Sequence, residues 1–202
     1  MKRVLFVNGC IRGKAVSRSY QLAQAFLAPM EEAGFVVEEV DLGAMCPQYL
    51  HYGNFAAREE KIAAGQLDDA MFDLARQFVS ADVILFAAPF WEYSFPAVVK
   101  AYIEQVSVCG LAFHYTPQGV EGLCRAKALV FCTTRGGFAS GQDAELEQGG
   151  RYLKAMCHMY GIDQMTMVAA EGLDIEGAPV ETRMEKAKAE AKETAKALCR
   201  NW

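Results

Sequence analysis

The chain has 202 residues, of which 52% are hydrophobic and 22% charged, and its formal net charge at pH 7 is −5. This length and apolar content predict a single domain over residues 1–202 with a sizeable buried core. A nucleic-acid partner is not expected, because the chain shows neither a basic surplus nor a basic stripe. Membrane insertion is not expected either, since no apolar run approaches the roughly 18 residues needed to cross a bilayer.

Seven cysteines are scattered along the chain without a CxxC pair. No histidine spacing completes a zinc site, so no metal is expected. The first strand-like segment, 4–7, is too short for the core of a signal peptide, and no small-residue cleavage site follows it. We therefore predict a cytoplasmic protein whose thiols are reduced and mostly buried.

Short β-branched and aromatic runs alternate with amphipathic segments. In chain order they predict a strand at 2–8, a helix at 17–32, a strand at 35–40, a long irregular excursion at 41–66 that is partly helical near its end, a helix at 68–80, a strand at 82–88, a helix at 95–108, a loop at 110–125, a strand at 126–132, a helix at 144–159, a strand at 165–170 and a helix at 179–198. This alternation implies an α/β fold of three layers, with helices on both faces of a parallel sheet. Five strands suit the doubly wound flavodoxin-like order 2-1-3-4-5.

Three loops follow predicted strands, and they should meet at the carboxyl edge of the sheet, where open parallel sheets bind ligands. The loop at 9–19 leads into a helix, whose unpaired N–H groups and positive dipole end suit a phosphate. It adds hydroxyls and basic side chains but matches neither the Walker A nor the GxGxxG pattern. The alternative is a capped helix behind a solvated basic loop.

The other two loops suit a planar ligand. The loop at 88–96 carries three aromatic residues in four positions, and these can flank a flat ring. The alternative is that they pack beneath neighbouring loops or in a subunit interface. The loop at 133–137 contains two adjacent glycines, which let backbone N–H groups approach a ligand closely, although an ordinary turn also uses them.

Together these segments resemble the flavodoxin-like NAD(P)H:quinone reductases, especially the short FMN-dependent azoreductases. The sequence AAPFWEYSFP at 87–96 is similar to the family's flavin-ring loop, and GLAFHYTPQGVEGL at 110–123 to its long connecting loop. TTRGG at 133–137 matches the family's glycine pair, and SRS at 17–19 falls where the family places phosphate-binding hydroxyls.

The resemblance implies an enzyme that uses FMN to pass two electrons, by ping-pong hydride transfer, from NADH or NADPH to a quinone, azo or related acceptor. It also implies a homodimer whose sites lie at the interface. The implied cofactor contacts are Cys10, Ser17, Arg18 and Ser19 at the phosphate, Pro89, Phe90, Trp91, Glu92 and Tyr93 at the ring, and Thr134, Gly136 and Gly137 at its pyrimidine edge. Phe113 and Tyr115 match positions that line the partner subunit's pocket. Cys10 stands where a serine is common.

No essential nucleophile is expected, and Glu92 and His114 are the two candidates for a catalytic side chain. An ionised Glu92 would lower the flavin potential and a neutral one could donate a proton, whereas the alternative is a side chain in solvent. His114 is either a proton donor or a surface histidine. Two other classes stay open: a non-enzymatic flavodoxin-type electron carrier or flavin-dependent redox sensor, and a nucleotide-binding transferase.

Overall fold

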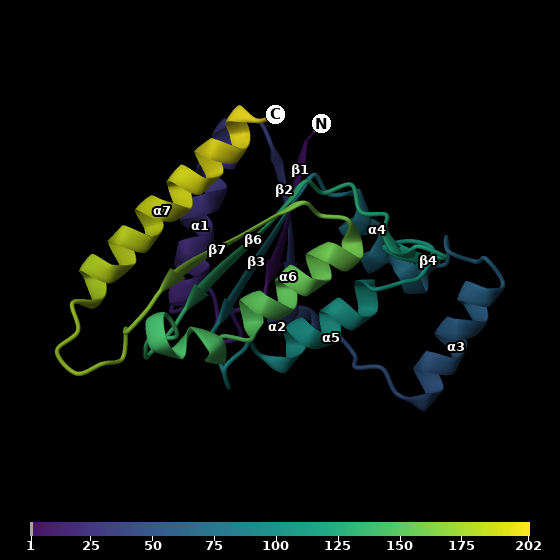
Figure 1. The fold of residues 1–202 in the computed structure, drawn as a ribbon, viewed down its shortest axis with the longest axis horizontal. Coiled ribbons are helices and arrows are strands. Elements are labelled where there is room, and N and C mark those ends of the chain that lie inside the picture. Colours follow the sequence, from purple (N-terminus) through teal and green to yellow (C-terminus); the bar gives the residue numbers. More distant parts are fainter. Residues whose placement is uncertain (1) are drawn as a thin grey trace.

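A parallel five-stranded sheet forms the middle layer of the protein, as a computed structural model of residues 2–202 shows (Figure 1). Its strands are β1 (Arg3–Asn8), β2 (Val36–Asp41), β3 (Val83–Pro89), β6 (Ala128–Thr134) and β7 (Gln164–Ala170). They lie in the order β2-β1-β3-β6-β7 and every pair is parallel. The predicted order 2-1-3-4-5 is therefore confirmed, because β4 and β5 belong to a separate hairpin.

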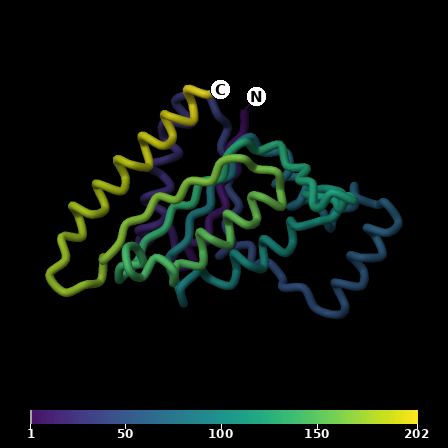
Figure 2. The backbone as a smooth tube through the Cα atoms, in the orientation of Figure 1, coloured from purple at the N-terminus to yellow at the C-terminus, as the bar shows by residue number. Residues whose placement is uncertain are grey.

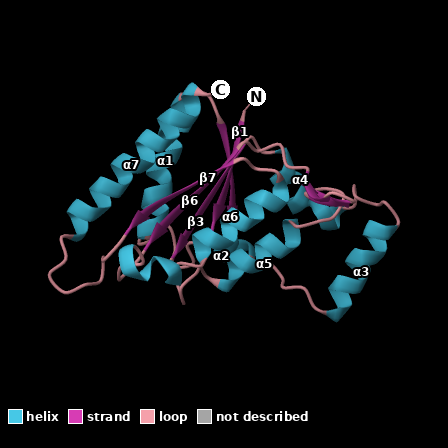
Figure 3. Cartoon of the chain, viewed as in Figure 1, coloured by secondary structure: helices cyan, strands magenta, loops and turns pink. Residues whose placement is uncertain are grey.

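Helices cover both faces of this sheet (Figures 1 and 3). One face carries α1 (Arg18–Glu32) and α7 (Val180–Arg200), and the other carries α4 (Asp73–Ser80), α5 (Ala97–Val106) and α6 (Gly149–Tyr160). In the part of the chain that the structure describes, no helix is both long enough and apolar enough to cross a membrane.

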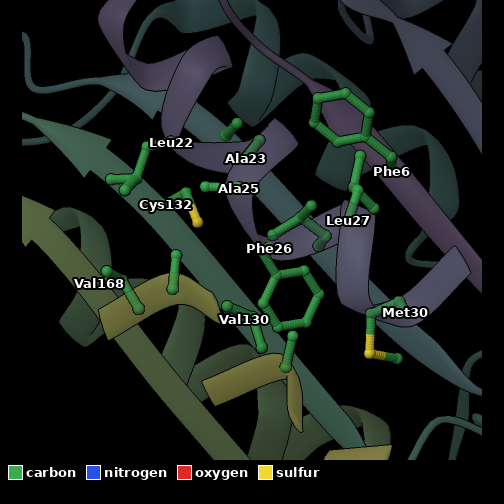
Figure 4. Close-up of a cluster of buried hydrophobic side chains, with 14 of the residues drawn as sticks. Phe6, Leu22, Ala23, Ala25, Phe26, Leu27, Met30, Val130, Cys132 and Val168 are labelled. Carbon is green, nitrogen blue, oxygen red and sulfur yellow. The ribbon is translucent and has the colours of Figure 1, made fainter. Parts of the chain in front are cut away.

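Each face of the sheet has its own buried core, because successive strand residues point to opposite sides. Phe6 of β1 packs toward α1, whereas its neighbours Leu5 and Val7 pack toward the other helical layer. Figure 4 shows the Phe26 ring of α1 beside Val130 of β6, and Met30 belongs to the same buried cluster. Burying a side chain such as Phe26 stabilises the fold by about 1.5–3 kcal/mol. These contacts hold α1 on the face of the sheet, with its first turn at the edge that carries the site.

The helix predicted at 95–108 is α5 at Ala97–Val106, and two other predicted helices begin about five residues later than expected. The sequence predicts that residues 68–72 open a helix, but Asp69 caps a short 3₁₀ turn, η1 (Ala70–Phe72), before α4 starts. The helix predicted from 144 is preceded by η2 (Gly141–Leu146), and α6 begins only at Gly149. The cause at α6 is Glu147, whose extended backbone breaks the spiral and whose carboxylate accepts the Gly150 N–H at 2.9 and 3.0 Å.

The predicted loop at 110–125 contains a hairpin instead, formed by β4 (Phe113–Thr116) and β5 (Gly119–Gly122). Gly122 packs so closely on the end of α6 that a Cβ there would lie 1.9 Å from the Gly161 nitrogen. This contact joins residues far apart in the chain, which local sequence patterns cannot reveal.

The segment 41–66 runs away from the sheet (Figure 2). It contains α2 (Leu42–Met45) and α3 (Tyr52–Ala63), which confirms the expectation of helix near its end. Buried Arg58 fastens α3 to the body of the protein, since its guanidinium donates to the carbonyl oxygens of Glu104 and Ser107.

Candidate functional site

A pocket of about 210 Å³ opens at the carboxyl edge of the sheet, where the loops after β1, β3, β6 and β7 meet. Most of the predicted cofactor contacts line it, namely Cys10, Ser17, Arg18, Ser19, Pro89, Phe90, Trp91, Thr134 and Gly136. The three loops that the sequence singled out are thus brought together by the fold.

The first turn of α1 forms one end of the pocket. Ser17 is the N-cap, and its Oγ accepts the Tyr20 N–H at 3.2 Å. The N–H groups of Arg18 and Ser19 have no acceptor within residues 2–202, and the turn contains no acidic residue. Unpaired N–H groups and the positive end of the helix dipole therefore face the pocket, as an anion site requires.

Polar side chains add to these backbone donors. The buried Ser19 hydroxyl lies 2.7 Å from that of Thr134. Arg18 reaches over the pocket to Asp174, with an Nη1–Oδ1 distance of 2.8 Å. Exposed Arg12 also lines the pocket and makes no ion pair among the residues described. Hydroxyl and guanidinium donors of this kind suit a phosphate.

The aromatic loop after β3 forms the other end of the pocket. Its start is fixed by the Phe90 N–H, which donates to the Thr134 carbonyl at 3.0 Å. Trp91 and Ser94 then exchange two backbone hydrogen bonds, of 3.1 and 2.7 Å, around a two-residue turn. Both residues of that turn have positive φ, 48° at Glu92 and 64° at Tyr93, where Asn and Gly are usual.

This turn is strained, because a residue with a Cβ loses roughly 1–2 kcal/mol in the left-handed region. Strain of this kind persists only where the surroundings hold the chain, and it clusters at functional sites. The turn presents Trp91 and Tyr93 to solvent. Two large aromatic side chains are thus exposed near the unpaired N–H groups of α1.

The Cys10 thiol is buried in the wall of the pocket, with its Sγ 3.5 Å from the Ala87 carbonyl oxygen. Burial raises the pKa of Cys10 to about 11, although a hydrogen bond with Ser17 opposes the shift. The side chain is therefore a neutral thiol near pH 7, which favours packing over redox chemistry.

Several predicted residues lie outside the pocket lining. Glu92, Tyr93 and Gly137 belong to loops that line the pocket, but these three residues are not part of its lining. Phe113 is buried in this chain's own core, whereas Tyr115 is 73% exposed on the hairpin. His114 pairs with Glu121 of the opposite hairpin strand at 3.0 Å and does not line the pocket either.

Five lining residues were not predicted: Arg12, Val16, Arg135, Leu173 and Asp174. One signal could have found Arg135. Thr134 and Ala170 are register partners on adjacent parallel strands, so Arg135 and Glu171, which follow them directly, emerge side by side with opposite charges.

A doubly wound sheet with unpaired helix N–H groups and an aromatic loop at its carboxyl edge defines a protein of the flavodoxin type. The family model for the flavodoxin-like fold matches residues 2–195. The chain is 34% identical to an FMN-dependent NADH:quinone oxidoreductase 2 of Clostridium acetobutylicum, over 96% of this chain and 100% of that protein. It is 36% identical to an FMN-dependent NADH:quinone oxidoreductase of Bacillus pumilus, over 98% of each chain. This protein therefore belongs to the family of flavodoxin-like FMN-dependent NADH:quinone oxidoreductases.

Solved structures agree with this assignment. The crystal structure of an azoreductase from Bacillus anthracis str. Sterne matches with a TM-score of 0.85 and 29% identity, over 96% of this chain and 99% of that one. The predicted fold class and the predicted family resemblance are both confirmed.

Proposed function

We propose that this protein is an FMN-dependent oxidoreductase that moves two electrons from NADH or NADPH to a quinone, an azo compound or a related acceptor. The observation that carries the proposal is a single pocket that joins phosphate donors to aromatic side chains at the carboxyl edge of the sheet. Relatives with 34% and 36% identity over nearly the whole chain are named for the same reaction, which supports it.

The chemistry of the pocket fits FMN. The hydroxyls of Ser17 and Ser19, the guanidinium of Arg18 and the unpaired N–H groups of the first turn would hold the phosphate. Phe90 and Trp91 would lie against the ring.

The polar edge of the ring would face the loop after β6. Thr134 and Gly136 line the pocket there. No atom lies within 4 Å of the place where a Cβ of Gly137 would stand, so a ligand can approach that backbone closely.

Bound FMN would supply a ring that accepts a hydride from a nicotinamide and returns two electrons to an acceptor. The part of the protein chain itself would be to bind this cofactor, orient it and shield it. Because Trp91 and Tyr93 leave the aromatic end open to solvent, the nicotinamide and the acceptor would use the same opening in turn. Ping-pong kinetics follow from that shared opening, and no side-chain nucleophile is required.

The active form would be a single-domain homodimer in the cytoplasm. Tyr115 supports the dimer, because a large aromatic side chain is exposed on a hairpin beside the body of the chain. Phe113 is engaged in the core, so any contribution of this hairpin to a partner's pocket would come from Tyr115. The cysteines are free thiols, which suits a reducing compartment.

Purified protein tests the proposal. We expect one FMN per chain, identified by absorbance and mass spectrometry, and NAD(P)H oxidation that accelerates when 1,4-benzoquinone is added. Initial rates should give parallel double-reciprocal lines. Tightly bound FAD, or no flavin binding, would refute the cofactor, and flavin without NAD(P)H oxidation would identify an electron carrier. Sedimentation of a fully active monomer would refute the dimer.

A further inference from the structure

A buried cluster of three charged side chains lies directly behind the aromatic loop. The Arg135 side chain is 2% exposed and stands between two carboxylates. Its Nη1 donates to Glu171 Oε1 at 2.6 Å, and its Nη2 lies 3.4 Å from Glu147 Oε1. Charges buried this deeply are costly unless they are paired, and such clusters often specify one conformation rather than add stability.

Arg135 supports the beginning of the aromatic loop. The centre of its guanidinium lies 5.0 Å from the centroid of the Phe90 ring, a cation–π distance. The residue before Arg135, Thr134, accepts the Phe90 N–H at 3.0 Å. The backbone and the side chain of this short segment therefore both hold Phe90.

The same cluster supports the end of the loop. Glu147 accepts the Gly150 N–H and so fixes the start of α6. The adjacent Gln148 N–H donates to the Tyr93 carbonyl at 2.8 Å. Arg135 is thus connected to the start of the aromatic loop through Phe90 and to its end through Glu147.

Glu171 holds the guanidinium from the opposite side. Its carboxylate also accepts the Ala139 N–H at 3.1 Å. Burial alone would raise the pKa of Glu171, but hydrogen bonds from Ser140, Arg135 and the Ala139 N–H together lower it. The planar fork of an arginine can engage both carboxylates and the Phe90 face at once, which the single ammonium group of a lysine cannot do.

We propose that Arg135 is a positioning residue, which through Glu147, Glu171 and the Phe90 ring holds the loop 89–94 in its strained, open shape. The purpose assigned to this shape, receiving the flavin ring, rests on the proposed function. The rigidity itself is a property of the chain without ligand.

Trp91 reports on the loop directly. The chain has two tryptophans, and Trp202 packs away from the loop against Phe35, so Trp202→Phe leaves Trp91 as the only indole. In this background, without flavin, we expect Arg135→Lys to increase the acrylamide quenching of Trp91 about twofold and to shorten its anisotropy decay. We also expect Arg135→Lys to raise the dissociation constant of FMN about tenfold or more.

Arg58→Lys is the matched control, because Arg58 is also a buried arginine but holds α3 instead of the loop. It should leave Trp91 quenching and FMN affinity unchanged. Glu171→Gln keeps the shape and the acceptor oxygen while removing a charge, and it covers the case in which Arg135→Lys does not fold. We expect it to loosen the loop in the same direction as Arg135→Lys.

Unchanged Trp91 quenching in both Arg135→Lys and Glu171→Gln would overturn the proposal. It would also be overturned if Arg58→Lys loosened the loop as much as Arg135→Lys, since the effect would then follow general destabilisation. A parent protein that bound no FMN would refute the proposed function alone, because the quenching of Trp91 in the ligand-free chain would still decide the role of Arg135.

Discussion

The Ser19 hydroxyl in the first turn of α1 lies 2.7 Å from the Thr134 hydroxyl at the end of β6. Ser17, two residues earlier, is engaged differently, since its Oγ caps the helix by accepting the Tyr20 N–H. The two serines of the proposed phosphate site therefore have separable structural roles, and substitution can distinguish binding from folding.

Ser19→Ala is expected to weaken FMN binding more than it weakens the fold. Losing a hydrogen bond to a charged phosphate costs about 1.5–3 kcal/mol, whereas a neutral hydroxyl pair contributes about 1 kcal/mol. Ser17→Ala should in addition lower the free energy of unfolding by about 1 kcal/mol, because it removes the N-cap. Flavin titration and urea unfolding measure the two quantities. Unchanged FMN affinity in the double variant would leave Ser17 and Ser19 with structural roles only.

Gly137→Ala separates ligand contact from folding in the loop after β6. A Cβ at Gly137 meets no atom within 4 Å, and the residue does not have a positive φ. We expect the free energy of unfolding to change by less than about 0.5 kcal/mol, while the FMN dissociation constant rises because the methyl group occupies the ligand's approach. Calorimetry on the apoprotein and flavin titration provide the comparison. Equal affinities for Gly137→Ala and the parent would place the ring edge elsewhere.

Much of the fold was predictable because its signals are local. The apolar runs within the predicted strands at 82–88 and 126–132 indicate strands that are covered on both faces, and the structure confirms both strands. The main site loops were predictable for the same reason, since each follows a strand and parallel strands end at one edge.

The rest depends on contacts between distant residues. The hairpin at 113–122 is short and is held by the docking of Gly122 on Gly161. The charged cluster of Arg135, Glu147 and Glu171 forms only once β6 and β7 are paired. Neither contact leaves a periodic pattern in the sequence from which it could be predicted.

Cys10 should be unreactive in the folded protein. Its pKa of about 11 leaves on the order of one thiolate in a thousand at pH 8, and the side chain is buried. Cys46, by contrast, is exposed at the end of α2. A disulfide reagent followed by peptide mass spectrometry should modify Cys46 rapidly and Cys10 only after unfolding, with Cys46→Ser as the control. Rapid native labelling of Cys10 would show an open phosphate loop.

The pKa of Glu171 predicts a dependence of stability on pH. Because hydrogen bonds lower this pKa in the folded protein, the carboxylate stabilises the fold above its unfolded pKa, and that contribution is lost as the pH falls through the folded value. The difference in unfolding free energy between the parent and Glu171→Gln should thus shrink below about pH 4.3. Urea unfolding at pH 7 and pH 3.5 measures it. Glu185→Gln, an exposed partner of Lys188, is the control. A difference independent of pH would argue against an ionised Glu171.

Glu92 occupies the first position of the strained turn, with a φ of 48°, and its side chain is exposed and does not line the pocket. Asparagine tolerates this backbone conformation far better than glutamate. We expect Glu92→Asn to raise the free energy of unfolding by about 1 kcal/mol, since the left-handed conformation is then less costly. Thermal and urea unfolding of the apoprotein test this.

Glu92→Gln keeps the strain and removes only the charge, and it therefore tests whether the carboxylate acts on the flavin. Because the side chain stands in solvent beside the pocket, we expect the two-electron midpoint potential and the pH profiles of both half-reactions to match those of the parent. An ionised carboxylate close to the ring would instead disfavour the reduced state, so its removal would raise the potential, with about 30 mV corresponding to 1.4 kcal/mol. A proton donor would slow acceptor reduction and remove one limb of its pH profile, leaving the reaction with NAD(P)H intact. Either result would show that the Glu92 carboxylate takes part in the reaction. Glu92→Asn would then lower the activity while it raises the free energy of unfolding.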